Sequence, residues 1–135
     1  MRGKLFLDTN ILIYAVAQDD PRTPVAEALL REGGVVSVQV LNEFVAVAHR
    51  KLGMHWKDVT EALHDIRVPY PDPVGLTIAT HKVALRIAAR HDCRIYDALI
   101  IAAALQAGCD VLCTEDMQDG HVIDRRLTIR NPFAA

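Results

Sequence analysis

Four acidic residues stand at places in the sequence where carboxylates could act together. Asp8 follows the apolar run KLFL, Glu43 and Asp97 lie early in predicted helices, and Asp116 comes shortly after the run DVLC. One such carboxylate has an ordinary explanation, because aspartate near a helix N-terminus accepts backbone N–H bonds. Four that converge would repel one another unless a cation lay between them. The pattern therefore indicates a bound metal ion.

The ligand types in this cluster narrow the choice of metal. Oxygen ligands with no histidine or cysteine beside them favour Mg²⁺ or Mn²⁺. The six histidines form no His-Glu-x-x-His motif and the three cysteines form no Cys-x-x-Cys pair, so we do not expect a zinc site. One such ion can activate a water molecule to attack a phosphodiester bond, while a second stabilises the leaving oxygen. The expected reaction needs no nucleophilic side chain.

Short apolar strands alternate with helices and must position these acids. Strands are predicted at 4–7, 35–38, 68 and 110–113, with one last strand over 122–129. Helices are predicted at 11–17, 24–32, 39–52, 56–66, 77–90 and 97–107. This alternation is typical of an α/β fold, in which a parallel sheet carries helices on both faces. Ligands bind such sheets beyond the carboxyl ends of the strands, so we expect the acids to share one site there.

Length and composition set the class of protein. The 135 residues fit a single domain, 1–135, and a hydrophobic fraction of 51% is typical of a packed core. No apolar run is long enough to cross a bilayer and the start carries no signal-peptide pattern, so we expect a cytoplasmic protein with no membrane segment. The net charge of −2 is unusual for a protein that binds nucleic acid. If a metal masks the four acids, however, the remaining surface is mildly basic.

Four short motifs follow one another in order along nearly the whole chain. They are Leu7-Asp8-Thr9-Asn10, Asn42-Glu43-Phe44, Tyr96-Asp97-Ala98-Leu99-Ile100, and Thr114-Glu115-Asp116 with Asp119 three residues on. Each motif is weak alone, but their order and spacing are specific together. In these motifs the chain resembles the PIN-domain ribonucleases, of the kind found as VapC-like toxins in bacterial toxin-antitoxin pairs.

The resemblance implies a three-layer, PIN-like fold with a central parallel sheet of strand order 3-2-1-4-5, flanked by helices. It implies an endoribonuclease that uses Mg²⁺ or Mn²⁺ to hydrolyse RNA. The metal-binding catalytic acids would be Asp8, Glu43, Asp97 and Asp116. The residues that orient them would be Thr9, Asn10 and Thr114, with Asp119 as a helper. The implied partners are the RNA substrate, an antitoxin protein that blocks the site, and a second copy of the chain in a homodimer.

Two assignments stay open in the sequence. Glu115, Asp116 and Asp119 follow the same strand, and a shift of one residue would exchange which acid faces the metal. We choose Asp116 because it fits the family's Thr-x-Asp pattern. The basic residues that could contact the RNA backbone are Arg50, Lys51, Arg86 and Arg90, although each also suits an ordinary solvated helix face.

Two other functions compete with this interpretation. A phosphatase of the haloacid-dehalogenase type would use Asp8 as a nucleophile, but that family has a second aspartate two residues on, where this chain has Asn10. It would also leave Glu43 and Asp97 without a role. The other alternative is a catalytically silent module of the same fold that binds RNA or protein. The complete set of acids argues against it.

Overall fold

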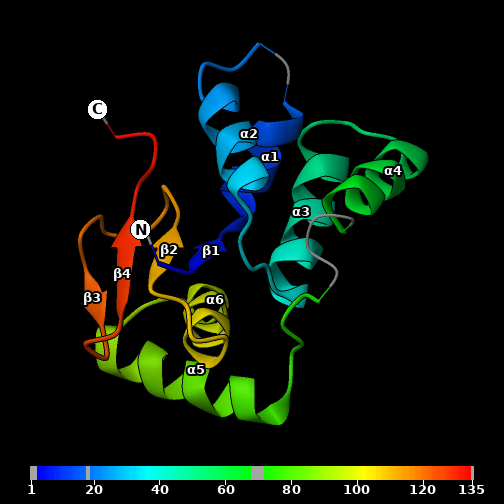
Figure 1. The fold of residues 1–135 in the computed structure, drawn as a ribbon. Helices are drawn as coiled ribbons and strands as arrows, with labels where there is room; N and C mark the ends of the chain where they lie inside the picture. The colour runs from blue at the N-terminus through cyan, green and yellow to red at the C-terminus, as the bar shows by residue number, and fades with distance from the viewer. Residues whose placement is uncertain (1–2, 18, 68–71, 135) are drawn as a thin grey trace.

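The structure is a computed structural model that describes residues 3–17, 19–67 and 72–134 (Figure 1). The predicted strand at Val68 lies outside these residues. In chain order the elements are β1 (Leu5–Leu7), α1 (Thr9–Val16), α2 (Thr23–Glu32), α3 (Val38–Arg50), α4 (Trp56–Arg67), α5 (Ile78–His91), α6 (Ile95–Gln106), β2 (Val111–Cys113), β3 (Val122–Ile123) and β4 (Leu127–Arg130). The predicted alternation of strands and helices is confirmed, with helix boundaries moved by at most two residues.

The sheet brings the first strand of the chain next to strands from its last quarter. The order of the four strands is β1-β2-β4-β3. Strand β2 pairs in parallel with β1, where Leu5 lies opposite Val111, and also in parallel with β4. Because β1 and β2 run in the same direction, the residues that follow each of them emerge at the same edge of the sheet.

The predicted sheet is wrong in its strand order and in being all parallel. Beyond β1, two isolated parallel bridges, Phe6 to Val35 and Ser37 to Val74, take the place of the predicted second and third strands. The segment around Val35 stays short because Ser37 already caps α3. Residues 69–73, before Val74, include three prolines, and proline has no N–H to donate to a strand ladder.

The predicted last strand over 122–129 is also wrong, because two antiparallel strands, β3 and β4, occupy it. The chain reverses at Asp124 and Arg125, whose φ angles of 50° and 57° lie in the left-handed region. The Arg126 N–H donates to the Ile123 carbonyl across this turn at 3.0 Å. Two successive left-handed residues suit the tight turn of a hairpin, and sequence periodicity gave no sign of them.

Helices lie on both sides of the sheet, as the predicted fold class requires (Figure 1). Helix α6 packs beneath the sheet with α5 outside it, while α1, α2 and α3 group on the other side and α4 lies outermost against α3. The core is apolar, and its largest fully buried side chains include Phe6, Phe44, Ile100 and Leu112. None of the described helices is long and apolar enough to cross a membrane.

Candidate active site

Asp8 is the most buried of the four predicted acids. It follows β1 directly and caps α1, and its side chain is 3% exposed. One carboxylate oxygen accepts the Thr9 N–H at 2.6 Å and the other accepts the Thr114 hydroxyl at 2.7 Å. Both oxygens are therefore held, and the carboxylate plane is fixed against the end of the sheet.

Thr114 and Asn10 join Asp8 to Asp116. The Thr114 hydroxyl, which is fully buried, accepts bonds from the Asn10 amide and from the Asp116 N–H, each at 3.1 Å. The Asn10 amide also donates to an Asp116 carboxylate oxygen at 3.1 Å. Three residues that the sequence placed around the site thus form one hydrogen-bonded network across 106 residues of chain.

Glu43 and Asp97 reach the same region from helices. Glu43 lies in the second turn of α3, where its carboxylate accepts a bond of 3.3 Å from the Gln39 amide one turn earlier. Asp97 lies in the first turn of α6. Both side chains are partly exposed. The Glu43 carboxylate accepts one hydrogen bond from a described residue, whereas the Asp8 carboxylate accepts two.

The four acids influence one another through their charges. The pKa of Asp8 is raised to about 6, mainly by burial and in smaller part by the charges of Asp116 and Asp97, while its hydrogen bonds to Thr114 and Thr9 lower it. Burial is also the largest cause that raises the pKa of Glu43, followed by the charge of Asp8. Burial and the charge of Asp116 raise the pKa of Asp97. Carboxylates that destabilise one another in this way gain from a cation placed among them.

Glu115 turns away from this cluster. Its carboxylate accepts a hydrogen bond from the Tyr14 hydroxyl and lies 3.4 Å from the Arg22 guanidinium, which stacks 4.0 Å from the centre of the Tyr14 ring. Burial and the bond to Glu115 raise the pKa of Tyr14 to about 12. The structure thus places Asp116, and not Glu115, beside Asp8.

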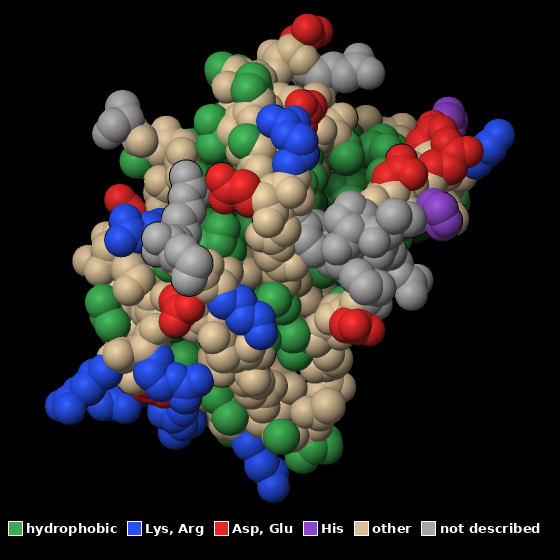
Figure 2. All heavy atoms as spheres, in the orientation of Figure 1, with side chains coloured by type: hydrophobic (Ala, Val, Ile, Leu, Met, Phe, Trp, Pro, Cys, Tyr) green, Lys and Arg blue, Asp and Glu red, His purple; other side chains and the backbone are tan. Residues whose placement is uncertain are grey.

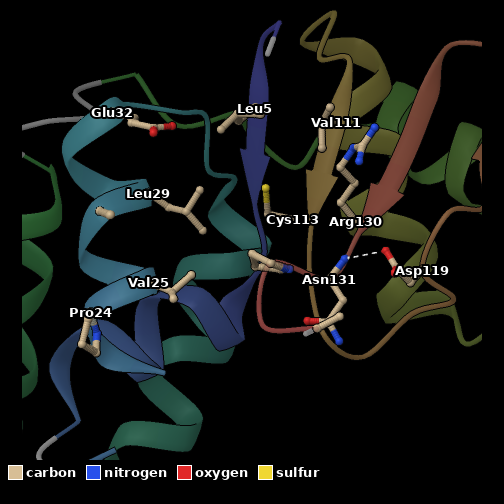
Figure 3. Close-up of a pocket in the computed structure, with 13 residues that line it drawn as sticks. Leu5, Pro24, Val25, Leu29, Glu32, Val111, Cys113, Asp119, Arg130 and Asn131 are labelled. Atoms are coloured by element: carbon tan, nitrogen blue, oxygen red, sulfur yellow. Dashed lines mark hydrogen bonds between the residues drawn. The ribbon is translucent and has the colours of Figure 1, made fainter. Parts of the chain in front are cut away.

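Asp119, predicted as a helper, does not join the acids. Its carboxylate accepts the Asn131 N–H at 2.9 Å and so ties the end of β4 to the loop after β2 (Figure 3). Both residues line a cavity of about 950 Å³ between α2 and the strands β1, β2 and β4. None of the four acids lines that cavity, so Asp119 belongs to a different part of the surface.

The predicted RNA-contact residues fall into two groups. Arg86 and Arg90 lie at 3.1 and 3.7 Å from the Asp124 carboxylate. Figure 2 shows basic side chains gathered at the lower left of the molecule, near one end of α5. Arg50 and Lys51 are exposed at the end of α3, the helix that carries Glu43.

Sequence reasoning missed two neighbours of the acids. The charge of Arg94, directly before α6, lowers the pKa of both Glu43 and Asp97. Gln39 holds the Glu43 carboxylate. Helical spacing could have found both, because Gln39 lies four residues before Glu43 and Arg94 lies three before Asp97.

The donor chemistry of the cluster suits a hard divalent cation. Four carboxylates with no histidine or cysteine among them are the ligand set of Mg²⁺ or Mn²⁺. Beside Asp8, the buried Thr9 hydroxyl has no hydrogen-bond partner, as expected of a group that faces bound water. Within the described ranges, no three His, Cys, Asp or Glu side chains are already spaced to hold an ion.

A sequence model of the PIN domain matches residues 5–118, a span that includes all four acids. The chain belongs to the PIN domain family. No curated protein sequence matches the chain. As the resemblance predicted, the family and its α/β fold class are confirmed. Many PIN domains are nucleases that use divalent metal ions.

Solved structures share this PIN fold at low sequence identity. The Mycobacterium tuberculosis toxin VapC20, described as cleaving the Sarcin-Ricin loop, is 23% identical with a TM-score of 0.65, over 81% of this chain and 87% of that one. A toxin-antitoxin complex from Klebsiella pneumoniae is 18% identical with a TM-score of 0.68, over 98% and 99%. VapBC2 from Rickettsia felis, bound to a promoter DNA fragment, is 18% identical with a TM-score of 0.68, over 94% and 97%. Each likeness extends over most of both chains.

Proposed function

We propose that this PIN domain is a metal-dependent endoribonuclease and the toxin of a toxin-antitoxin pair. The observation that carries the proposal is the convergence of Asp8, Glu43, Asp97 and Asp116, whose charges act on one another although they come from four separate elements. A chain that keeps mutually repelling acids together, two of them after parallel strands and two on helices, loses stability without a cation. A cluster that costs the metal-free protein stability is expected where the acids bind a metal ion for catalysis.

The four acids would hold Mg²⁺ or Mn²⁺. Bound there, the ion would activate water and neutralise charge on the phosphodiester. The chain's own residues supply orientation. The Thr9 N–H and the Thr114 hydroxyl donate to the two oxygens of Asp8, and the Asn10 amide donates to an oxygen of Asp116. Such supporting bonds keep ligands in the geometry that catalysis needs.

The environment of Asp8 argues against the phosphatase alternative. A nucleophilic aspartate must present an oxygen to the substrate, whereas both oxygens of Asp8 accept hydrogen bonds and the side chain is 3% exposed. Attack by water is the mechanism that this arrangement supports.

The toxin role and the partners extend the proposal. Structures that share the fold are described as an RNA-cleaving toxin and as toxin-antitoxin complexes. We therefore assign RNA as the substrate, an antitoxin protein as the inhibitor, a homodimer as the assembly and the cytoplasm as the location. An antitoxin could block the site by directing a cationic side chain at the acids.

One assay tests the enzyme. The purified protein, freed of any antitoxin, should cleave single-stranded RNA with Mg²⁺ or Mn²⁺ and should stop when EDTA is added. Asp8→Asn should lose at least about 100-fold in rate, because even residues that only orient a metal ligand contribute about 10- to 100-fold. Asp65→Asn, an exposed acid on α4, is the matched control and should cleave like wild type. Undiminished cleavage in EDTA would exclude the metal mechanism, and binding of metal with no cleavage would favour the silent module.

A further inference from the structure

A flat aromatic surface lies at the junction of α3 and α4. The rings of His49 and Trp56 stack with their centroids 3.7 Å apart and their planes at 16°. His49 Nδ1 lies 3.0 Å from the Met54 carbonyl, an acceptor, so this nitrogen donates and fixes the imidazole ring. One face of Trp56 is thus covered by a ring that cannot turn freely.

The rest of Trp56 is open to solvent. Trp56 is 59% exposed, although tryptophan is a large, mainly apolar residue that is usually well buried. The contact with His49 explains why the indole is ordered, but not why a large apolar face is left outside. A stacked, ordered and exposed ring is what proteins use to hold an unpaired nucleic-acid base.

The charges around this ring suit a phosphate backbone. Residues 49–57 include the exposed cations Arg50, Lys51 and Lys57 and no acidic residue. The first acid of α4 is Asp58, directly after Lys57, and Figure 2 shows acidic and histidine side chains gathered over the region of that helix. A strand of RNA would therefore meet positive charge on the α3 side of Trp56.

Helix α3 connects this surface to the acid cluster. Arg50 follows Glu43 by seven residues, which is close to two helical turns, so both side chains lie on the same face about 10 Å apart along the axis. His49 is the neighbour of Arg50 in the last turn of that helix. One rigid element thus carries a metal-ligand candidate, a cation and the base of the aromatic stack.

We infer that the exposed face of Trp56, supported by His49, binds an unpaired base of the RNA substrate while Arg50 contacts the adjacent backbone. This inference rests on the proposed ribonuclease function and adds to it a site that selects single-stranded over paired RNA. Bases within a duplex are already stacked on each other and offer no free face to the indole.

Trp56 is the single tryptophan of the chain, so its fluorescence reports on this site directly. The Asp8→Asn protein, which should leave RNA uncut, is titrated with a mixed-sequence single-stranded oligoribonucleotide and with a duplex of the same sequence. We expect the single strand to quench the fluorescence and the duplex to leave it nearly unchanged. Equal quenching by both, or quenching by neither, would overturn the inference. A change on dilution without RNA would assign the face to a second copy of the chain and overturn it equally.

Substitutions measure the contribution of the stack in the same Asp8→Asn background. Trp56→Ala should raise the Kd for the labelled single strand about 5- to 150-fold, the range for loss of one stacked base. Trp56→Phe should stay within about threefold because an aromatic face remains. Leu85→Ala, which removes an equally exposed apolar side chain from α5, is the control and should leave Kd unchanged. Arg50→Gln should lower the slope of log Kd against log salt by about one.

The results separate this site from the proposed function. Quenching by single strands without any cleavage by the wild-type protein would remove the ribonuclease and keep the base-binding site. Metal-dependent cleavage with an unchanged KM in Trp56→Ala would keep the ribonuclease and remove the site. If Trp56→Ala does not fold, the fluorescence titration and the Arg50→Gln salt slope still decide.

Discussion

The two halves of the acid cluster are built differently. Asp8, Asn10 and Thr114 form a buried network at the ends of two paired strands, and the exposed Asp116 joins it through hydrogen bonds with Asn10 and Thr114. Glu43 and Asp97 stand on helices, are partly exposed and share no hydrogen bond with that network among the described contacts. The difference shows where rigidity lies. The sheet half sets a fixed reference, and the helix half can adjust to what binds.

The comparison has an energetic side. Desolvation is the largest cause of a raised pKa at Asp8, Glu43 and Asp97, but Asp8 is far more deeply buried than the other two. Solvent screens a partly exposed charge, so Glu43 and Asp97 should lose less stability from repulsion than the buried Asp8. Substitutions in the two halves should therefore affect stability to different extents.

The largest expected effect is the pH dependence of the metal-free protein. The pKa of Asp8 is about 6 in the folded state and 3.8 ordinarily, so folding favours the protonated form. The stability that this proton provides is present below about pH 4 and is lost as pH rises through 6. The difference corresponds to about 3 kcal/mol in the free energy of unfolding.

Urea unfolding in EDTA at pH 4 and pH 7 measures this effect, with Asp8→Asn as the reference that lacks the titrating group. Wild type should lose about 3 kcal/mol relative to the variant between the two pH values. If the difference in unfolding free energy between wild type and Asp8→Asn were the same at both pH values, the pKa of Asp8 would not be raised by folding.

Next in size is the contrast between neighbours in the loop after β2. Asp116→Asn should lower RNA cleavage by about 100-fold, because it removes a charge facing Asp8. Glu115→Gln should cost less than about tenfold, since Glu115 bonds Tyr14 and Arg22 instead. Rates under identical Mg²⁺ concentrations decide, and the opposite order would exchange the roles of the two acids.

The smallest effect concerns the helix half. Asp97→Asn keeps a polar side chain in the first turn of α6 and removes one charge, so the metal-free protein should gain about 1 kcal/mol after screening is allowed for. That corresponds to a Tm about 4 °C higher. Added Mg²⁺ should raise the Tm of wild type by binding the folded state and should raise that of Asp97→Asn much less. Equal Mg²⁺ responses would take Asp97 out of the site.

The sequence predicted the sheet half well because strand ends locate it. Asp8 and Asp116 follow short apolar runs that are typical of buried strands, and parallel strands bring such residues to one edge. Asn10 and Thr114 were named through the family pattern, and their hydrogen bonds connect the two acids. The predicted strand order was wrong because Val35 and Val74 form only one-residue bridges where full strands were expected, and because the antiparallel strand β3 adds to the far edge.

Contacts between side chains that are distant in the sequence could not be predicted from it. Nothing in the order of residues indicates that Glu115 pairs with Tyr14 and Arg22, since the partners lie 101 and 93 residues away. The same limit applies to Asp119, whose bond to Asn131 depends on how β4 ends. The stack of His49 on Trp56 depends on the turn between α3 and α4 and had no pattern of its own.

The pairing of β1 with β2 has a consequence for the time at which the proposed active site would be complete. Leu5 meets Val111 and Leu7 meets Cys113, so the first strand has no parallel neighbour of its own length until more than 100 further residues exist. Contacts of such long sequence separation form late and slowly. On a ribosome, where synthesis proceeds at about 5–20 residues per second, the emerging chain passes several seconds with Asp8 made and Asp116 absent. The proposed nuclease site needs residues from both ends of the chain, so it would stay incomplete while the growing chain is beside the RNA that encodes it.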